Sequence, residues 1–268
     1  MMFNYITWNV TPTAFHIFGL EVRWYGVMFA GAFAIAFLLC GRMLTKEGRT
    51  QNVADTLLLY LGIATIVGAR LGHCLFYEPS YYLQHPIEIL RIRDGGLASH
   101  GGAIAVAIAL WLAARKHQET FWYLTDRIVI LIALVGSFIR MGNLFNSEIY
   151  GGTTTLPWGF IFELNDEILP KHPTQIYEAL SYLVLFFVLY WYYLHKQRKP
   201  KQGQIFGWFL IGLFGMRFLI EFVKSVQEPW EVHYMLKMGQ ILSIPFILAG
   251  IVILLLVHQN KLPWTQHK

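Results

Sequence analysis

Long, nearly uncharged apolar runs recur along this 268-residue chain and constrain its fold more than any other feature. A helix needs about 20 mainly apolar residues to cross the hydrocarbon core of a bilayer. Such runs recur from Tyr25 to His258 and leave no room for a soluble domain of any size. Only 14% of the residues are charged, against about 25% in soluble domains. We therefore expect an all-α, polytopic integral membrane protein in which residues 1–268 form a single transmembrane domain.

The apolar runs predict about seven spanning helices. They lie at residues 22–42, 56–76, 97–114, 126–142, 174–194, 203–222 and 236–258. With seven spans, the two termini are expected on opposite sides of the membrane.

The distribution of basic residues predicts the orientation. One alternate set of loops carries twelve: Arg42, Lys46, Arg49, Arg115, Lys116, Arg127, Lys196, Arg198, Lys199, Lys201, Lys261 and Lys268. The opposite set carries six: Arg23, Arg91, Arg93, Lys171, Lys224 and Lys237. Because cytoplasmic loops are enriched in Lys and Arg, we expect the N-terminus outside and the C-terminus in the cytoplasm. Loop basicity also accounts for the net charge of +5 without a nucleic-acid partner.

The fourth predicted span is short. From Asp126 to Arg140 it covers only about 21 Å, against a hydrocarbon core of about 30 Å. The Gly- and Asn-rich residues 141–148 that follow are not expected to continue a regular helix. Irregular backbone at membrane depth is tolerated where protein or water covers it. We therefore predict a polar cavity in the outer-leaflet half; a loop that begins early is the alternative. Asp126 and Arg127 are expected to be an interfacial anchor.

Five polar side chains from five spans are predicted to lie at similar depth on the outer-leaflet side. They are Tyr25, Arg70, His100, Arg140 and Arg217. Ionisable groups inside a membrane are costly and mark functional sites, whereas independent structural roles would scatter them through both halves. We therefore expect these side chains to converge on one site.

Neighbouring residues suggest partners for two of these groups. Glu221 is four residues after Arg217 and is expected to share its helix face, either in the site or as a structural ion pair. Gly101 and Gly102 follow His100, and such a pair lets another group approach the backbone of the helix start, which favours an anion. The alternative for His100 is a structural hydrogen bond.

Two further segments open predicted spans. Residues 172–178, which read His-Pro-Thr-Gln-Ile-Tyr-Glu, open the fifth span, and Gln240 opens the seventh. They are expected either to cap these helices at the interface or to contribute to the site.

Several of these segments resemble the prolipoprotein diacylglyceryl transferase family. The family signature GRxGNFxNxExxG aligns with residues 139–151, where Ile139 and Leu144 depart from it at packing positions. The polar and glycine positions match: Arg140, Gly142, Asn143, Asn146, Glu148 and Gly151. Residues 22–26, 68–72, 99–102, 172–178, 217–222 and 238–245 extend the resemblance over nearly the whole chain. Many members carry a tyrosine four residues before the second arginine. This chain has Leu213 there, so any role of that hydroxyl is absent or moved.

The resemblance implies a bacterial inner-membrane enzyme whose active site faces the outer leaflet. Its reaction moves the sn-1,2-diacylglyceryl group of phosphatidylglycerol to the lipobox cysteine of a prolipoprotein, forming a thioether and releasing glycerol phosphate. It implies no metal or organic cofactor. The implied partners are phosphatidylglycerol, the precursor's signal-peptide and lipobox region, and membrane lipids.

The reaction also implies roles for the site residues. His100 is the expected base, because a thiolate is the reactive form of cysteine; Glu148 and a water are the alternatives. Arginines suit a phosphate that gains charge, so Arg140 is expected to bind the headgroup and Arg217 the developing charge. The other expected binding residues are Tyr25, Arg70, Gly101, Gly102, Asn143, Asn146, Glu148 and Glu221.

Two other functions are considered. A transporter of anions predicts polar residues that continue into the cytoplasmic half and an internal repeat, and the sequence has neither. A non-catalytic protein that binds anionic lipid explains Arg140 and Arg217, but it gives no reason for a histidine beside a glycine pair.

Overall fold

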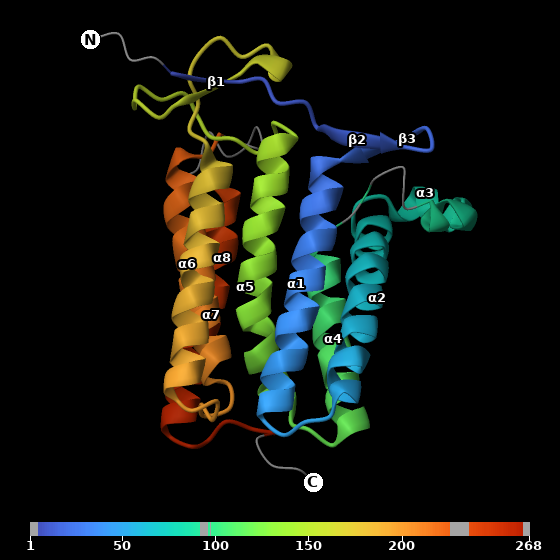
Figure 1. Ribbon diagram of the computed structural model, residues 1–268, viewed down its shortest axis with the longest axis vertical. Coiled ribbons are helices and arrows are strands. Elements are labelled where there is room, and N and C mark those ends of the chain that lie inside the picture. Colours follow the sequence, from blue (N-terminus) through green and yellow to red (C-terminus); the bar gives the residue numbers. More distant parts are fainter. Residues whose placement is uncertain (1–4, 92–95, 97, 226–235, 265–268) are drawn as a thin grey trace. The chain divides into compact units, whose positions relative to one another are not determined.

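The computed structural model describes residues 5–91, 96, 98–225 and 236–264 (Figure 1). Arg93 and Lys268, which enter the loop counts above, lie outside these residues. In the described part, six helices are long and apolar enough to cross a membrane. They are α1 (Trp24–Lys46), α2 (Gln51–Phe76), α5 (Phe121–Phe145), α6 (Thr174–His195), α7 (Gln204–Ile220) and α8 (Met238–His258). The polytopic, helical architecture predicted from the apolar runs is confirmed.

The third predicted span is present as helix α4 (Ser99–His117). It begins with Ser-His-Gly-Gly and ends with Arg-Lys-His, so the apolar stretch between them is short. For this reason α4 is not among the six long apolar helices. The count of seven spans therefore stays a prediction.

The prediction of a short fourth span is wrong. Helix α5 begins at Phe121 and continues through the Gly- and Asn-containing residues to Phe145, which gives a length of about 37 Å. Tertiary contacts outweigh the low helix propensity of these residues. A Cβ atom on Gly142 would lie 2.9 Å from Cδ2 of Tyr25, so this glycine lets α1 pack closely on α5. The chain leaves the helix at Ser147 and Ile149, which have φ values of 53° and 61°.

The chain forms two compact units, the first comprising residues 1–38 and 126–262 and the second residues 39–125 and 263–268. In the first unit, α7 packs against both α6 and α8 (Figure 1). Strand β1 (Ile6–Trp8) pairs in parallel with β4 (Phe160–Phe162), and β2 (Thr13–Ile17) pairs with the antiparallel strand β3 (Leu20–Arg23). The indole N–H of Trp8 donates to the Leu144 carbonyl (3.1 Å), which attaches β1 to the end of α5.

The topology of the first unit gathers several helix termini at one end. Helices α5 and α7 end there, while α6 and α8 begin there (Figure 1). The short 3₁₀ helix η4 (Glu221–Val223) follows α7, and η3 (Glu163–Asn165) follows β4. Leu144, Phe160 and Phe162 form a small buried core beside these termini.

In the second unit, α2 and α4 pack through glycines. A Cβ atom on Gly101 would lie 2.4 Å from the Gly68 carbonyl oxygen and 2.6 Å from the Gly72 Cα atom. Such small-residue contacts let membrane helices approach closely. The connection between the two helices contains α3 (Pro79–Gln84) and the 3₁₀ helix η1 (Pro86–Leu90).

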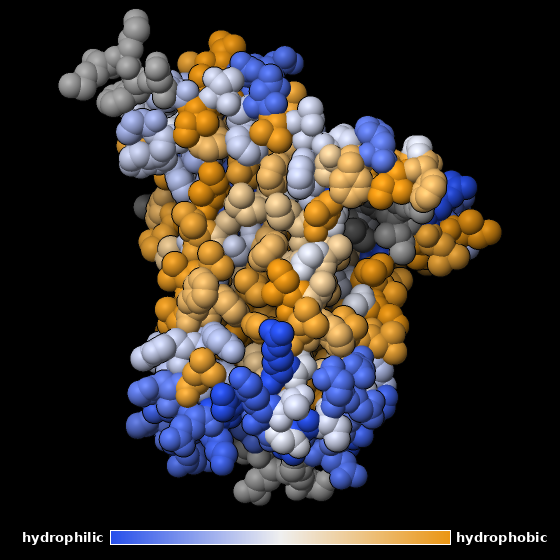
Figure 2. All heavy atoms as spheres, in the orientation of Figure 1, coloured by the Kyte–Doolittle hydropathy of each residue, from blue (hydrophilic) through white to orange (hydrophobic). Residues whose placement is uncertain are grey.

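Large apolar side chains are exposed along helices of both units, for example Leu59 and Ile63 on α2 and Phe187 and Trp191 on α6. Figure 2 shows apolar side chains over the helices and hydrophilic ones at their ends. Exposed apolar surface of this extent is expected where lipid covers a protein.

Candidate active site

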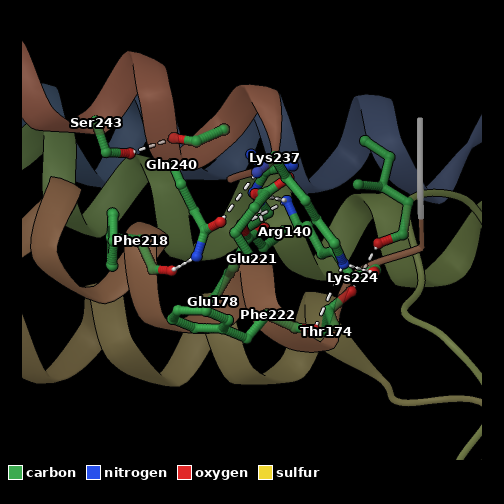
Figure 3. A network of polar contacts seen from close by, with 12 residues as sticks. Arg140, Thr174, Glu178, Phe218, Glu221, Phe222, Lys224, Lys237, Gln240 and Ser243 are labelled. Atoms are coloured by element: carbon green, nitrogen blue, oxygen red, sulfur yellow. Dashed lines mark hydrogen bonds and ion pairs between the residues drawn. The ribbon is translucent and has the colours of Figure 1, made fainter. Parts of the chain in front are cut away.

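A buried charge network joins α5, α6 and the segment after α7 within the first unit (Figure 3). Arg140 Nε lies 2.7 Å from Glu178 Oε2, and Lys224 Nζ lies 2.8 Å from Glu178 Oε1. The side chains of Glu178 and Lys224 are only 1% and 3% exposed. Because isolated charges are very costly inside a protein or membrane, each group depends on the others. Glu178 thus holds two cations, one on each carboxylate oxygen.

The signature residues extend this network toward the loop after α5. Arg140 Nη1 donates to Asn143 Oδ1 (3.1 Å). The side-chain amides of Asn143 and Asn146 both donate to Glu148 Oε1, at 2.7 and 3.2 Å. Tyr25 lies beside the same residues, because its ring packs on Gly142. The structure therefore brings five predicted site residues together: Tyr25, Arg140, Asn143, Asn146 and Glu148.

The start of α6 fixes this loop in place. Thr174 Oγ1 donates to the Ile149 carbonyl (2.8 Å), and Gln175 Nε2 donates to the Glu148 carbonyl (2.7 Å). The segment that opens the fifth predicted span thus orients the signature loop. Gln240 accepts a hydrogen bond from the Lys237 N–H (3.0 Å), as the capping interpretation expects.

Glu221 has a different partner from the one predicted. The ion pairs of the described residues do not join it to Arg217; its carboxylate faces Lys224, with Oε2 3.9 Å from Nζ. The backbone N–H of Glu221 still donates to the Arg217 carbonyl, but Glu221 also begins the 3₁₀ helix η4, which is followed directly by Lys224. The carboxylate also packs on α8, where a Cβ atom on Gly239 would lie 2.3 Å from Oε2.

Sequence analysis did not identify Lys224 as a site residue and treated Glu178 only as part of a span-opening segment. The signal for Glu178 was a carboxylate four residues into a span, which needs a cation nearby. The signal for Lys224 was its spacing of three residues from Glu221. Neither signal identifies the partner, because the contact joins segments from different helices.

In the second unit, Arg70 stabilises the connection between α2 and α4. Among the described residues, its guanidinium donates to the backbone carbonyls of Ile89 (from Nε, 2.9 Å), Glu88 (from Nη2, 2.6 Å) and Gly96 (from Nη1, 3.3 Å). The residue is 4% exposed. Arg70 thus satisfies backbone carbonyls of the segment that precedes His100.

His100 lies in the first turn of α4 and is exposed. Its ring contacts those of Phe76 and Tyr77, with centroids 5.3 and 5.7 Å apart. The glycines beside His100 were expected to let another group approach the backbone closely. At Gly101, the group that does so is helix α2. Gly102 is also buried.

The five side chains expected to converge belong to two compact units. Tyr25, Arg140 and Arg217 belong to the first compact unit, and Arg70 and His100 to the second. Convergence of the two groups on one site stays a prediction. The predicted polar cavity also stays a prediction; the concavity on α7 and α8 is apolar. Its lining residues are Ile211, Gly212, Gly215, Met216, Phe218, Leu219 and Ile247.

Comparison with known proteins gives consistent matches over this architecture. A family model described as prolipoprotein diacylglyceryl transferase matches residues 12–256. A protein of Tolumonas auensis is 48% identical over 256 residues, covering 95% of this chain and 98% of the relative. A protein of Porphyromonas gingivalis is 45% identical, covering 98% and 97%. A protein of Nitrosomonas europaea is 43% identical, covering 91% and 88%. All three relatives bear the name phosphatidylglycerol–prolipoprotein diacylglyceryl transferase.

Proposed function

This chain belongs to the prolipoprotein diacylglyceryl transferase family, and from that premise we propose how it acts. It is a multi-pass membrane transferase that moves the sn-1,2-diacylglyceryl group of phosphatidylglycerol to a prolipoprotein, the first step of lipoprotein maturation. The acceptor is the thiol of the lipobox cysteine, and the products are a thioether and glycerol phosphate. The observation that supports this proposal best is the network in which Glu178 and Asn143 fix the guanidinium of Arg140.

The chemistry requires stabilisation of a phosphate leaving group. The thiolate attacks the sn-3 carbon, the bond from that carbon to the phosphate oxygen breaks, and glycerol phosphate leaves with the oxygen and the electron pair. The phosphodiester becomes a phosphomonoester and gains negative charge. Donors held in place before the reaction stabilise such charge at little reorganisation cost.

Arg140 is oriented for this task. Glu178 engages Nε and Asn143 engages Nη1, so both contacts fix the plane of the guanidinium. Lys224 places a second positive charge beside Glu178. Because the single negative charge of Glu178 is shared between two cations, it does not fully neutralise the charge of Arg140. We assign Arg140 to the headgroup phosphate.

Arg217 is assigned to the charge that develops on the leaving group. It lies in the last turn of α7, in the same unit as Arg140, and the ion pairs of the described residues do not include it. A guanidinium stays charged at all physiological pH values. Arg217 thus keeps its charge available for a phosphate.

His100 is assigned as the base that accepts the thiol proton. Two amides already donate to Oε1 of Glu148, so that oxygen is engaged as a structural acceptor. A His100→Gln variant should lose activity and the pH dependence of kcat in the neutral range. Unchanged activity and an unchanged pH profile would contradict the assignment.

The apolar concavity beside Arg217 supports access from the bilayer. Its lining side chains lie on α7 and α8, and Met216 and Phe218 flank Arg217 in the sequence. An acyl chain in this concavity would place its headgroup near the arginine. We therefore propose that the lipid approaches laterally in the outer leaflet, with the N-terminus of the protein outside and the C-terminus in the cytoplasm.

The proposed activity is tested by incubating the purified protein with phosphatidylglycerol and a lipobox peptide and weighing the peptide by mass spectrometry. A diacylglyceryl mass increase is expected, and a peptide with serine in place of cysteine should show none. If the cysteine peptide gains no mass from active lipid while the protein is folded, the proposal is wrong. The chain would then bind anionic lipid without catalysis.

A further inference from the structure

Tyr182 lies beside the charge network and has no role in the function derived so far. It is on α6, four residues after Glu178, so both side chains share one helix face. Its ring packs on α5, where a Cβ atom on Gly136 would lie 3.1 Å from Cδ2 of Tyr182. Gly136 is one turn before Arg140, so Glu178 and Tyr182 meet α5 one turn apart. The tyrosine is 6% exposed and thus belongs to the protein interior.

The hydroxyl of Tyr182 contributes to the electrostatics of the proposed site. It interacts with the guanidinium of Arg140, and the charges of Glu178 and Arg217 act on it as well. A guanidinium has only donors, so the phenol oxygen is the acceptor in the interaction with Arg140. Its O–H proton then remains available to an acceptor, either a carboxylate oxygen of Glu178 or a bound phosphate oxygen.

We propose that Tyr182 is a positioning residue that orients Arg140 relative to Arg217, so that both guanidinium groups bind one phosphate. The inference rests on the proposed function and adds a residue to its binding site. Three groups then fix the guanidinium of Arg140 from different directions: the Glu178 carboxylate, the Asn143 amide and the Tyr182 hydroxyl. Without the hydroxyl, the guanidinium keeps its ion pair but loses one of these constraints.

The opposite helix does not provide this hydroxyl. Leu213 is four residues before Arg217 on α7 and shares its face, but it has an aliphatic side chain. In this chain, α6 therefore supplies the phenol that interacts with Arg140. A tyrosine at position 213 would approach the same guanidinium groups from the side of α7.

The test compares Tyr182→Phe, Leu213→Tyr and the double variant in the peptide transfer assay. Tyr182→Phe keeps the packing ring and removes only the hydroxyl. One lost hydrogen bond to a charged group predicts a roughly 10- to 100-fold lower kcat, with KM for the peptide unchanged. Adding Leu213→Tyr to Tyr182→Phe should recover at least about a third of the decrease in log kcat. Tyr190→Phe, the same change two turns further along α6, is the matched control and should leave kcat unchanged.

Two results would overturn the inference. The first is a kcat of Tyr182→Phe within twofold of the wild-type value. The second is a double variant that has the same thermal stability as Tyr182→Phe but no higher kcat. Calorimetric titration with glycerol 1-phosphate separates this inference from the proposed function. If the wild type transfers no lipid but Tyr182→Phe still weakens binding of glycerol 1-phosphate about tenfold or more, the transferase proposal fails and the role of Tyr182 stands. Equal binding by both proteins in that case would reject both.

Discussion

Replacing Glu178 by glutamine should destabilise the protein more than any exposed charge change. The substitution keeps the side-chain size but removes the negative charge between Arg140 and Lys224, whose nitrogens lie 2.7 and 2.8 Å from its oxygens. Breaking a buried ion pair from one side costs about 3–5 kcal/mol. Glu221, with Oε2 3.9 Å from Lys224 Nζ, compensates in part. We therefore take the lower end, about 3 kcal/mol, which is roughly a 100-fold change in the unfolding equilibrium.

The mechanism predicts how a second substitution acts. In Glu178→Gln, the buried ammonium of Lys224 is the most poorly compensated group, since its side chain is 3% exposed. Adding Lys224→Met removes that charge and should recover at least half of the lost stability, because apolar groups of similar size replace buried pairs at little cost. The coupling between the two substitutions is read from a double-mutant cycle.

The assay is reversible unfolding in mixed detergent micelles, followed by circular dichroism. Glu21→Gln, the same change in an exposed pair with Arg23, is the matched control and should leave the midpoint unchanged. If Glu178→Gln unfolds at the wild-type midpoint, or if Lys224→Met lowers its stability further, the account of the charge network is wrong.

Substitutions at two further positions test packing and capping. Gly101→Ala should destabilise the protein by about 1–3 kcal/mol, because the new Cβ atom would lie 2.4 Å from the Gly68 carbonyl oxygen; an unchanged melting temperature would contradict this. Asp126→Ala should cost about 1–3 kcal/mol, because the buried carboxylate accepts hydrogen bonds from the N–H groups of Gly203 (2.8 Å) and Phe206 (2.9 Å) at the start of α7. Asp126→Asn, which retains one acceptor oxygen, should be less destabilised than Asp126→Ala; equal losses would contradict the capping role.

The sequence predicts the helices of this protein well because their main determinant is local. A long apolar run has few alternatives in a bilayer, and six of the seven predicted spans correspond to long apolar helices. The error at α5 has a non-local cause. Gly142 looks unfavourable for a helix, but it packs against Tyr25 at the start of α1. Such contacts depend on the fold and cannot be predicted from the helix propensity of the residues.

The site is predictable where residues share one segment. Arg140, Asn143 and Glu148 occur within nine residues, and the structure links them directly. The cation for Glu221 was predicted incorrectly, because its carboxylate faces Lys224, which follows the short 3₁₀ helix after α7. Asp126 was interpreted as an interfacial anchor, whereas the structure shows it buried as a cap of α7.

The central claim is that Arg140 binds the phosphate of the lipid donor, and the most direct measurement is transfer by an Arg140→Ala variant. Wild-type protein and the variant are supplied with the same phosphatidylglycerol and lipobox peptide, and the lipidated peptide and glycerol phosphate are both quantified by mass spectrometry. Arg42→Ala, at an exposed position, is the control. We expect equal amounts of the two products from wild type and control, and neither product from Arg140→Ala. Equal transfer by Arg140→Ala and wild type would contradict the account.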